Sequence, residues 1–229
     1  MMNSKMLVRL VFHVFVTVMY FCALVRYEYL PPMPHRRSHE HFAGRWKYLT
    51  YWNLIAQFLF FALSCILDLI KVSPSTYHKM MRVRDKMYAG IVLPYGVFVV
   101  AVFWILYTID RELIFPRVLD AVFPAWLNHV SHTVILPVLL LETYILKHRH
   151  PRRKDGVVIT ALFGIVYASW VLYLALVMDI WPYPILQIIN WTQRFVFFAI
   201  CIVFLLFMYL VGERINCTFW GESIVQKVK

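Results

Sequence analysis

Five polar side chains share one face of an otherwise apolar segment that begins near residue 48. Counted from Thr50, the other four follow at offsets of 3, 7, 14 and 18 positions, and they are Asn53, Gln57, Ser64 and Asp68. At about 100° per residue, a helix places all five within roughly 60° of Thr50. Such a stripe is expected to face the interior of a helix bundle, because exposing it to lipid is costly. The hydroxyl of Thr50 is a candidate nucleophile.

A second polar cluster contains histidine, the side chain that most often acts as a general base. Asn128, His129 and His132 stand at i, i+1 and i+4, and Glu142 lies deeper in the same apolar segment. A hydroxyl beside a neutral imidazole is the minimum set for nucleophilic acyl transfer, in which the imidazole takes the hydroxyl proton and the alkoxide attacks a carbonyl carbon. Thr50 and His132 would suit an ester whose chains stay in lipid while its carbonyl group reaches the polar stripe.

Both side chains also have ordinary structural interpretations. A threonine near a helix start usually bonds a carbonyl one turn back, which here belongs to Trp46, and a histidine in a bundle usually bonds a neighbouring helix. His129 and His132 could instead bind a metal or haem, with His13 as the facing ligand. One such pair is fewer than membrane di-iron enzymes need, so we expect no metal and no cofactor. The residues alone leave the choice between ester cleavage and helix packing open.

The composition of the chain points to lipid as its main solvent. Of its 229 residues 62% are hydrophobic and only 15% are charged, whereas a soluble domain carries roughly a quarter charged residues. The apolar runs last about twenty residues, which is the length that a helix needs to cross the hydrocarbon. They do not alternate as barrel strands would. We therefore predict an all-α, polytopic membrane bundle in a single domain, 1–229, with about six spans near 6–25, 48–70, 88–109, 126–146, 157–178 and 193–211.

The basic residues give the bundle an orientation. Fifteen of the 23 lysines and arginines lie in the N-terminal segment, the 71–87 and 147–156 connections and the C-terminal tail. The positive-inside rule then places both termini in the cytoplasm. Thr50 and His132 fall near the opposite, non-cytoplasmic ends of their spans, so they can meet at one depth. We attribute the formal net charge of +11 to loops that face anionic membrane lipid and not to nucleic-acid binding. The 26–47 connection, with three prolines, is expected to form an extended strap on the non-cytoplasmic side.

The same polar residues carry a resemblance to a known family. Residues 44–50, Gly-Arg-Trp-Lys-Tyr-Leu-Thr, followed by Asn53 and Gln57, resemble one of its motifs. Residues 126–129, Trp-Leu-Asn-His, with His132 and Thr133, resemble the other. The family is that of the androgen-induced gene 1 protein and the androgen-dependent TFPI-regulating protein, and the resemblance covers about residues 44–221. The 45–48 run and the ending at Trp220 favour the TFPI-regulating branch.

This resemblance implies a multipass hydrolase of fatty acid esters of hydroxy fatty acids, with a threonine nucleophile and a histidine. By motif these are Thr50 and His132, working as a dyad because no intramembrane carboxylate lies at the right depth. Asn128 and His129 would orient the histidine or donate to the oxyanion, with two further supporting residues on the Thr50 face, Asn53 and Gln57.

Basic residues one turn before Thr50, namely Arg45 and Lys47, would hold the free carboxylate of the substrate. The expected partners are the lipid substrate and the surrounding membrane lipids, in the plasma membrane or the endoplasmic reticulum. Two other functions fit the residues less well. They are a non-enzymatic membrane regulator or scaffold, and a metal-dependent oxidoreductase that uses His129 and His132.

Overall fold

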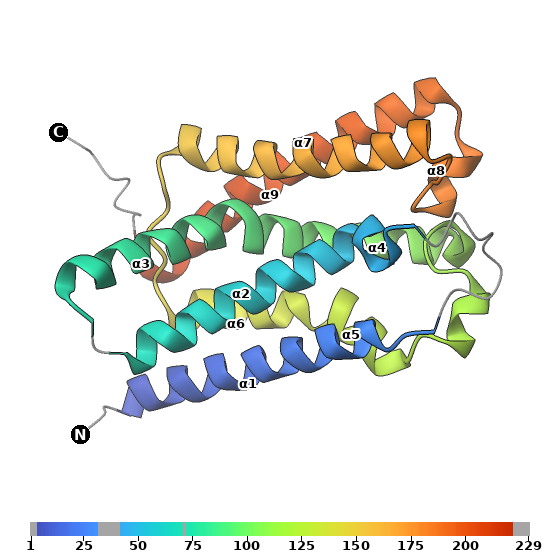
Figure 1. Ribbon diagram of the computed structural model, residues 1–229. Coiled ribbons are helices and arrows are strands. Elements are labelled where there is room, and N and C mark those ends of the chain that lie inside the picture. The colour runs from blue at the N-terminus through green and yellow to red at the C-terminus, as the bar shows by residue number, and fades with distance from the viewer. Residues whose placement is uncertain (1–3, 32–41, 71, 222–229) are drawn as a thin grey trace.

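The computed structural model of the chain describes residues 4–31, 42–70 and 72–221, and its regular structure in these ranges is entirely helical. The long helices run side by side in one bundle (Figure 1). The predicted all-α membrane fold is therefore confirmed. The α-helices are α1 (Ser4–Glu28), α2 (Leu49–Leu69), α3 (Pro74–Met87), α4 (Leu93–Asp110), α5 (Ala125–His132), α6 (Ile135–Ile145), α7 (Arg153–Val177), α8 (Pro184–Ile188) and α9 (Trp191–Trp220).

Among the residues that the structure describes, five helical stretches are long and apolar enough to cross a membrane. They are α1, α2, the continuous stretch Pro74–Leu113, α7 and α9. The first described turn of α1 and the last turn of α9 lie at the same end of the bundle (Figure 1). The cytoplasmic location of that end remains a prediction. Of the predicted strap at 26–47, residues 26–31 and 42–47 are described. Its two ends are helical and not extended, because α1 continues to Glu28 and a 3-10 turn covers Gly44–Lys47.

The third spanning stretch is longer than the sequence pattern indicated. Residues 74–87, which we expected to form a basic connecting loop, are helix α3. Its start has a clear local cause, because Pro74 stands at the first helical position and the Ser73 hydroxyl accepts a hydrogen bond from the Thr76 amide (3.3 Å). A π-helical turn, Tyr88–Val92, then joins α3 to α4 without a break.

The segment predicted as one span near 126–146 is two helices, α5 and α6. The amides of Thr133 and Val134 both donate to the His129 carbonyl, at 2.8 and 2.9 Å, where the helix turns. Pro137 has no N–H and cannot donate to the carbonyl of Thr133, which weakens the helical ladder at this point. The break places His132 at the last turn of a short helix inside the bundle.

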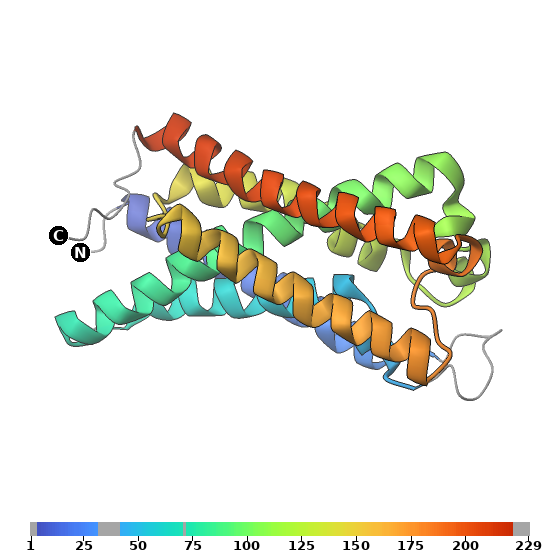
Figure 2. The same ribbon diagram turned by 90° about the horizontal axis from the view of Figure 1, so that it is seen from above.

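Helices α2 and α4 are the inner helices of the bundle. Their apolar windows are mostly buried within the protein, whereas those of α1, α7 and α9 are mostly exposed, as lipid-facing helices would be. One core cluster joins α1, α2, α4, α5 and α6, and a second joins α4 to α7, α8 and α9. Helices α7 and α9 lie together across one face and separate towards the end that carries α8 (Figure 2). Thr50 and His132 lie at that end.

Candidate active site

Thr50 lies in the first turn of α2, just after a 3-10 turn (Gly44–Lys47) and the extended residue Tyr48. The carbonyl of Trp46, one turn back, already accepts hydrogen bonds from the indoles of Trp52 (2.8 Å) and Trp170 (3.0 Å). The Thr50 hydroxyl instead lies 3.2 Å from Nε2 of His132. The structure thus brings together the two residues that the sequence could place only at a common depth.

The His132 ring is held on three sides. Its Nδ1 atom lies 3.1 Å from the Asn128 backbone carbonyl and 2.8 Å from the Asn128 side-chain oxygen. Both are acceptors, so Nδ1 carries the ring proton and the lone pair of Nε2 faces Thr50. The ring also stacks on Phe103, with centroids 3.7 Å apart and an interplanar angle of 11°. Thr50, His132 and Asn128 therefore form a hydrogen-bonded row of the kind seen in hydroxyl–imidazole–acceptor triads.

The other supporting residues predicted from the sequence lie outside this row. His129 is exposed, and its Nδ1 atom lies 3.2 Å from the hydroxyl of Thr133. The Gln57 amide donates to Asn53 (3.3 Å) and to the Val92 carbonyl (3.0 Å), so this part of the stripe joins α2 to the start of α4. Within the residues that the structure describes, no group of three His, Cys, Asp or Glu side chains is arranged to hold a metal ion.

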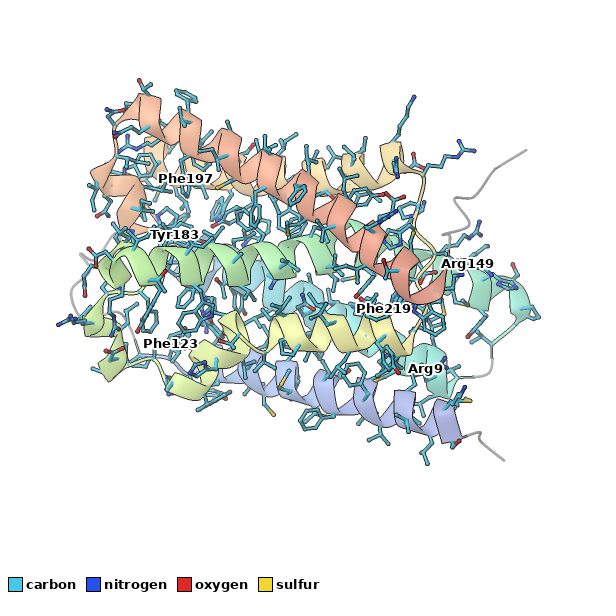
Figure 3. The ribbon with its side chains drawn as sticks, turned by 180° about the vertical axis from the view of Figure 1, so that it is seen from behind. Arg9, Phe123, Arg149, Tyr183, Phe197 and Phe219 are labelled. Atoms are coloured by element: carbon cyan, nitrogen blue, oxygen red, sulfur yellow. The ribbon has the colours of Figure 1, made fainter. Side chains whose placement is uncertain are left out.

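A cavity of about 790 Å³ opens onto Thr50 and His132. Its walls come from α4, α7, α8, α9 and the connection between α4 and α5. The lining is mostly apolar, which suits the acyl chains of a lipid better than a polar metabolite. Figure 3 shows Tyr183 and Phe197 between α4 and α9, on the wall opposite α5. Other wall residues include Phe98, Val102, Leu106, Phe115, Val171, Phe198 and Leu205.

Both basic residues predicted to meet a substrate carboxylate line this cavity. Arg45 forms an ion pair with Glu28 (2.8 Å) and also donates to the backbone carbonyl of Tyr27. Lys47 is buried, with only 3% of its surface exposed. The pairing of either residue with a substrate carboxylate remains a prediction.

Two tyrosines that contact the start of α2, Tyr167 of α7 and Tyr183, were not predicted from the sequence as site residues. The Leu49 amide lies 2.9 Å from the hydroxyls of both Tyr167 and Tyr183, and the Tyr167 hydroxyl donates to the Lys47 carbonyl (2.9 Å). Burial raises the pKa of Tyr183 to about 12, so its phenol stays protonated at neutral pH. Tyr183 stands in the Trp-Pro-Tyr-Pro run that leads into α8. Nothing in that pattern indicated contact with Thr50's neighbour.

A cluster of ionisable side chains at the far end of the bundle was also missed as a unit. Glu142 of α6 lies 3.0 Å from His13 of α1 and 3.0 Å from His148, and His13 lies 2.7 Å from Asp68 of α2. His148 in turn lies 3.2 Å from Asp85 of α3. Guanidinium groups close both ends of this row, Arg9 on Asp68 and Arg84 on Asp85. Asp68 is eighteen positions after Thr50, about 27 Å along α2, so the cluster is separate from the cavity.

Comparison with known proteins places the chain in a family. A family model described as FAR-17a/AIG1-like protein matches residues 8–217. The human androgen-induced gene 1 protein is 37% identical over 195 residues, which cover 81% of this chain and 82% of that protein. The human androgen-dependent TFPI-regulating protein is 36% identical over 181 residues, covering 78% and 79%. No solved structure matches.

The identities of 37% and 36% are too close to each other to assign the chain to one of the two branches. The family model extends over both motifs and most of the helices. The matched region contains Thr50, Asn128 and His132 as well as the cavity walls. The resemblance seen in the two polar clusters is thus a relationship of the whole bundle. The chain belongs to the FAR-17a/AIG1-like protein family.

Proposed function

We propose that the protein is an intramembrane carboxylic ester hydrolase that cleaves fatty acid esters of hydroxy fatty acids. The observation that carries the proposal is the row from Thr50 through His132 to Asn128 at an apolar cavity. A row of this kind is the requirement for nucleophilic acyl transfer, and the apolar wall suits acyl chains. The substrate class comes from the family resemblance and from the basic residues in the wall.

In the first half of the reaction, Nε2 of His132 takes the proton of the Thr50 hydroxyl as its oxygen attacks the ester carbonyl carbon. The carbonyl π electrons move to the carbonyl oxygen, and a tetrahedral intermediate forms. When it collapses, the bond to the alkoxy oxygen breaks, and His132 gives its proton to that oxygen. The hydroxy fatty acid leaves, and the acyl group stays on Thr50.

Water completes the cycle. His132 takes a proton from a water molecule, whose oxygen attacks the acyl carbon, and the proton passes to the Thr50 oxygen as the fatty acid departs. Asn128 keeps the ring in one tautomer throughout, because both of its oxygens accept from Nδ1. Phe103 limits rotation of the ring by stacking on its face.

The cavity wall carries positive charge from Lys47 and Arg45, which suits the free carboxylate of the substrate. A fatty acid ester of a hydroxy fatty acid carries one free carboxylate, which Lys47 would meet in the wall near Thr50. Arg45, which also pairs with Glu28, would lie beside this carboxylate. The two hydrocarbon chains would occupy the apolar wall and the surrounding lipid.

The test compares purified wild-type protein with Thr50→Ser, Thr50→Ala and His132→Ala. Each is given a branched fatty acid ester and a fluorophosphonate probe. We expect turnover and labelling in the wild type and in Thr50→Ser, and loss of both in the other two. Loss should reach at least about 10³-fold, as for removal of a nucleophile or its base elsewhere. Normal turnover by Thr50→Ala would end the proposal.

The same experiment addresses the alternatives. A non-enzymatic regulator would show no turnover in any form. A metal-dependent enzyme would lose activity with a chelator and with His129→Ala, whereas the threonine mechanism is indifferent to both.

A further inference from the structure

We propose that Tyr183 is the oxyanion donor, so that its phenolic hydroxyl stabilises the negative carbonyl oxygen formed when Thr50 attacks the ester. This inference rests on the proposed hydrolase function. It assigns a catalytic role to a residue that lies just before α8 and outside the two sequence motifs. Tyr183 stands about 130 positions after the nucleophile.

The position of the Tyr183 hydroxyl is fixed by the backbone next to the nucleophile. Its oxygen lies 2.9 Å from the amide nitrogen of Leu49, the residue that precedes Thr50. Tyr183, Leu49, Thr50 and His132 all line the same cavity. An ester carbonyl that approaches Thr50 therefore comes to the start of α2, where the Tyr183 hydroxyl is anchored.

Among the hydrogen-bonding groups around the Leu49 amide, the hydroxyl hydrogen of Tyr183 is the one that is free to rotate. The Tyr167 hydroxyl gives its hydrogen to the Lys47 carbonyl, so its oxygen can only accept in the 2.9 Å contact with Tyr183. The Leu49 amide supplies its hydrogen to the tyrosine oxygens. Only the Tyr183 hydrogen remains to be placed, and it can point at Tyr167 or swing into the cavity. A hydroxyl whose oxygen is held while its hydrogen can rotate is suited to meet a charge that appears during reaction.

Several other cavity-lining donors have partners of their own. The Tyr95 hydroxyl donates to the Thr160 carbonyl (2.7 Å), and the Tyr27 hydroxyl lies 3.1 Å from Ser131. Arg45 binds Glu28 and the Tyr27 carbonyl. Tyr183 differs from these residues in that its hydroxyl oxygen is anchored at the start of α2, beside the nucleophile.

The start of α2 favours the same charge. The N-terminus of a helix carries a partial positive charge, and the unpaired amides of its first turn point outward. An oxyanion beside Leu49 and Thr50 lies in this field. In the attack, the Thr50 oxygen bonds to the carbonyl carbon and the π electron pair moves to the carbonyl oxygen. His132 holds the proton of the Thr50 hydroxyl, and Tyr183 donates a hydrogen bond to the oxyanion without losing its own proton.

The first test is Tyr183→Phe, with Tyr209→Phe as the matched control. Tyr209 is buried outside the cavity, and its hydroxyl has no hydrogen-bond partner among the residues that the structure describes. Removing one oxyanion donor typically lowers kcat by about 10²-fold. We expect that loss in Tyr183→Phe with KM within about twofold, and an unchanged kcat in Tyr209→Phe. Wild-type kcat in Tyr183→Phe would overturn the assignment.

Binding of two inhibitors separates catalysis from a structural effect on α2. A trifluoromethyl ketone of the acyl chain forms a tetrahedral oxyanion adduct with a hydroxyl nucleophile, whereas an uncleavable ether analogue of the ester does not. Tyr183→Phe should weaken the ketone by a factor similar to its loss in kcat and leave the ether unchanged. Equal weakening of both would mean that Tyr183 only shapes the cavity, and the assignment would fail.

A second variant covers the case in which Tyr183→Phe does not fold. Replacing Tyr183 by 3,5-difluorotyrosine keeps both hydrogen bonds but makes the phenol more acidic. The alkaline loss of kcat should then move to lower pH, and an unchanged pH profile would count against the donor role. The two proposals can be refuted separately. Absence of ester turnover in the wild type refutes the hydrolase function, whereas turnover that requires Thr50 but is unchanged in the Tyr183 variants refutes only the oxyanion donor.

Discussion

Asn128 presents two oxygen atoms to one nitrogen of His132, its backbone carbonyl at 3.1 Å and its side-chain oxygen at 2.8 Å. The side chain is therefore a second, redundant anchor for the ring. Asn128→Ala should lower kcat by about five- to tenfold, which corresponds to one hydrogen bond of about 1 kcal/mol. Asn128→Asp keeps an acceptor at the same place and should retain most of the activity. Steady-state kinetics on the branched ester check both, and an inactive Asn128→Asp would contradict the orienting role.

His129 should be dispensable although it is part of the same motif. Its ring contacts Thr133 on an exposed side of α5 and does not touch Thr50 or His132. We expect His129→Ala to keep kcat and KM within about twofold, as surface substitutions usually do. Turnover before and after a chelator is the measurement. A large loss would show that His129 takes part in the chemistry after all.

Lys47 should distinguish substrates by their free carboxylate. Lys47→Gln removes a charge-assisted hydrogen bond, which is worth about 1.5–3 kcal/mol, so KM for the free acid should rise by about tenfold or more. The methyl ester of the same substrate cannot make this bond, and its KM should hardly change. Arg45→Gln tests the second basic residue in the same way. Equal changes for acid and methyl ester would refute the pairing.

Glu142 should be required for stability and not for the chemistry. It is fully buried between His13 and His148, and removing one partner of a buried charged network typically costs about 3–5 kcal/mol. Glu142→Gln should lower the midpoint of thermal unfolding in detergent, whereas kcat below the transition should stay near wild type. A double-mutant cycle with His148→Gln should show strong coupling, and additive effects would contradict a shared network.

His150 should make stability depend on pH. It is buried in the connection between α6 and α7, where burial and then the nearby His148 lower its pKa below 6.5. As the pH falls through about 6.5, the unfolded chain binds the proton first, so the folded state loses stability down to the lowered pKa.

We expect His150→Gln, which cannot titrate, to remove this loss. The stability difference between wild type and variant should shift in favour of the variant between about pH 7 and pH 5. Unfolding in detergent at several pH values measures it. The Asn216 amide lies 3.4 Å from the His150 Nδ1 atom and can also meet a glutamine oxygen, so the fold should survive the change.

The sequence was most informative where spacing along one helix decides the outcome. The face shared by Thr50 and Asp68, and the i, i+4 relation of Asn128 and His132, follow from helical periodicity alone. The meeting of Thr50 with His132 needed more, because it joins residues 82 positions apart. Common depth in the membrane made it possible, and only the family resemblance made it the favoured interpretation.

Other features depend on contacts that no local pattern encodes. His13 was considered only as the facing ligand of a possible haem, and its two carboxylate partners stand 55 and 129 positions away. The Tyr183 contact with Leu49 spans 134 positions. In contrast, the Ser-Pro start of α3 was present in the sequence, and the charge of residues 79–86 led us to treat a helix as a loop.

The ionisable cluster also has a consequence for how the chain is made. Its members arrive in sequence during synthesis: Arg9 and His13 with α1, Asp68 with α2, and Glu142 only with α6. Until α6 is in place, the earlier helices hold charges that lipid tolerates poorly. Arg9 and His13 can pair with Asp68 once α1 and α2 are in place, but Nε2 of His13 meets its second carboxylate only when α6 is added. A chain truncated before Glu142 would therefore hold a polar His13 nitrogen in the membrane without its Glu142 partner, which is a feature that distinguishes the incomplete chain from the complete one.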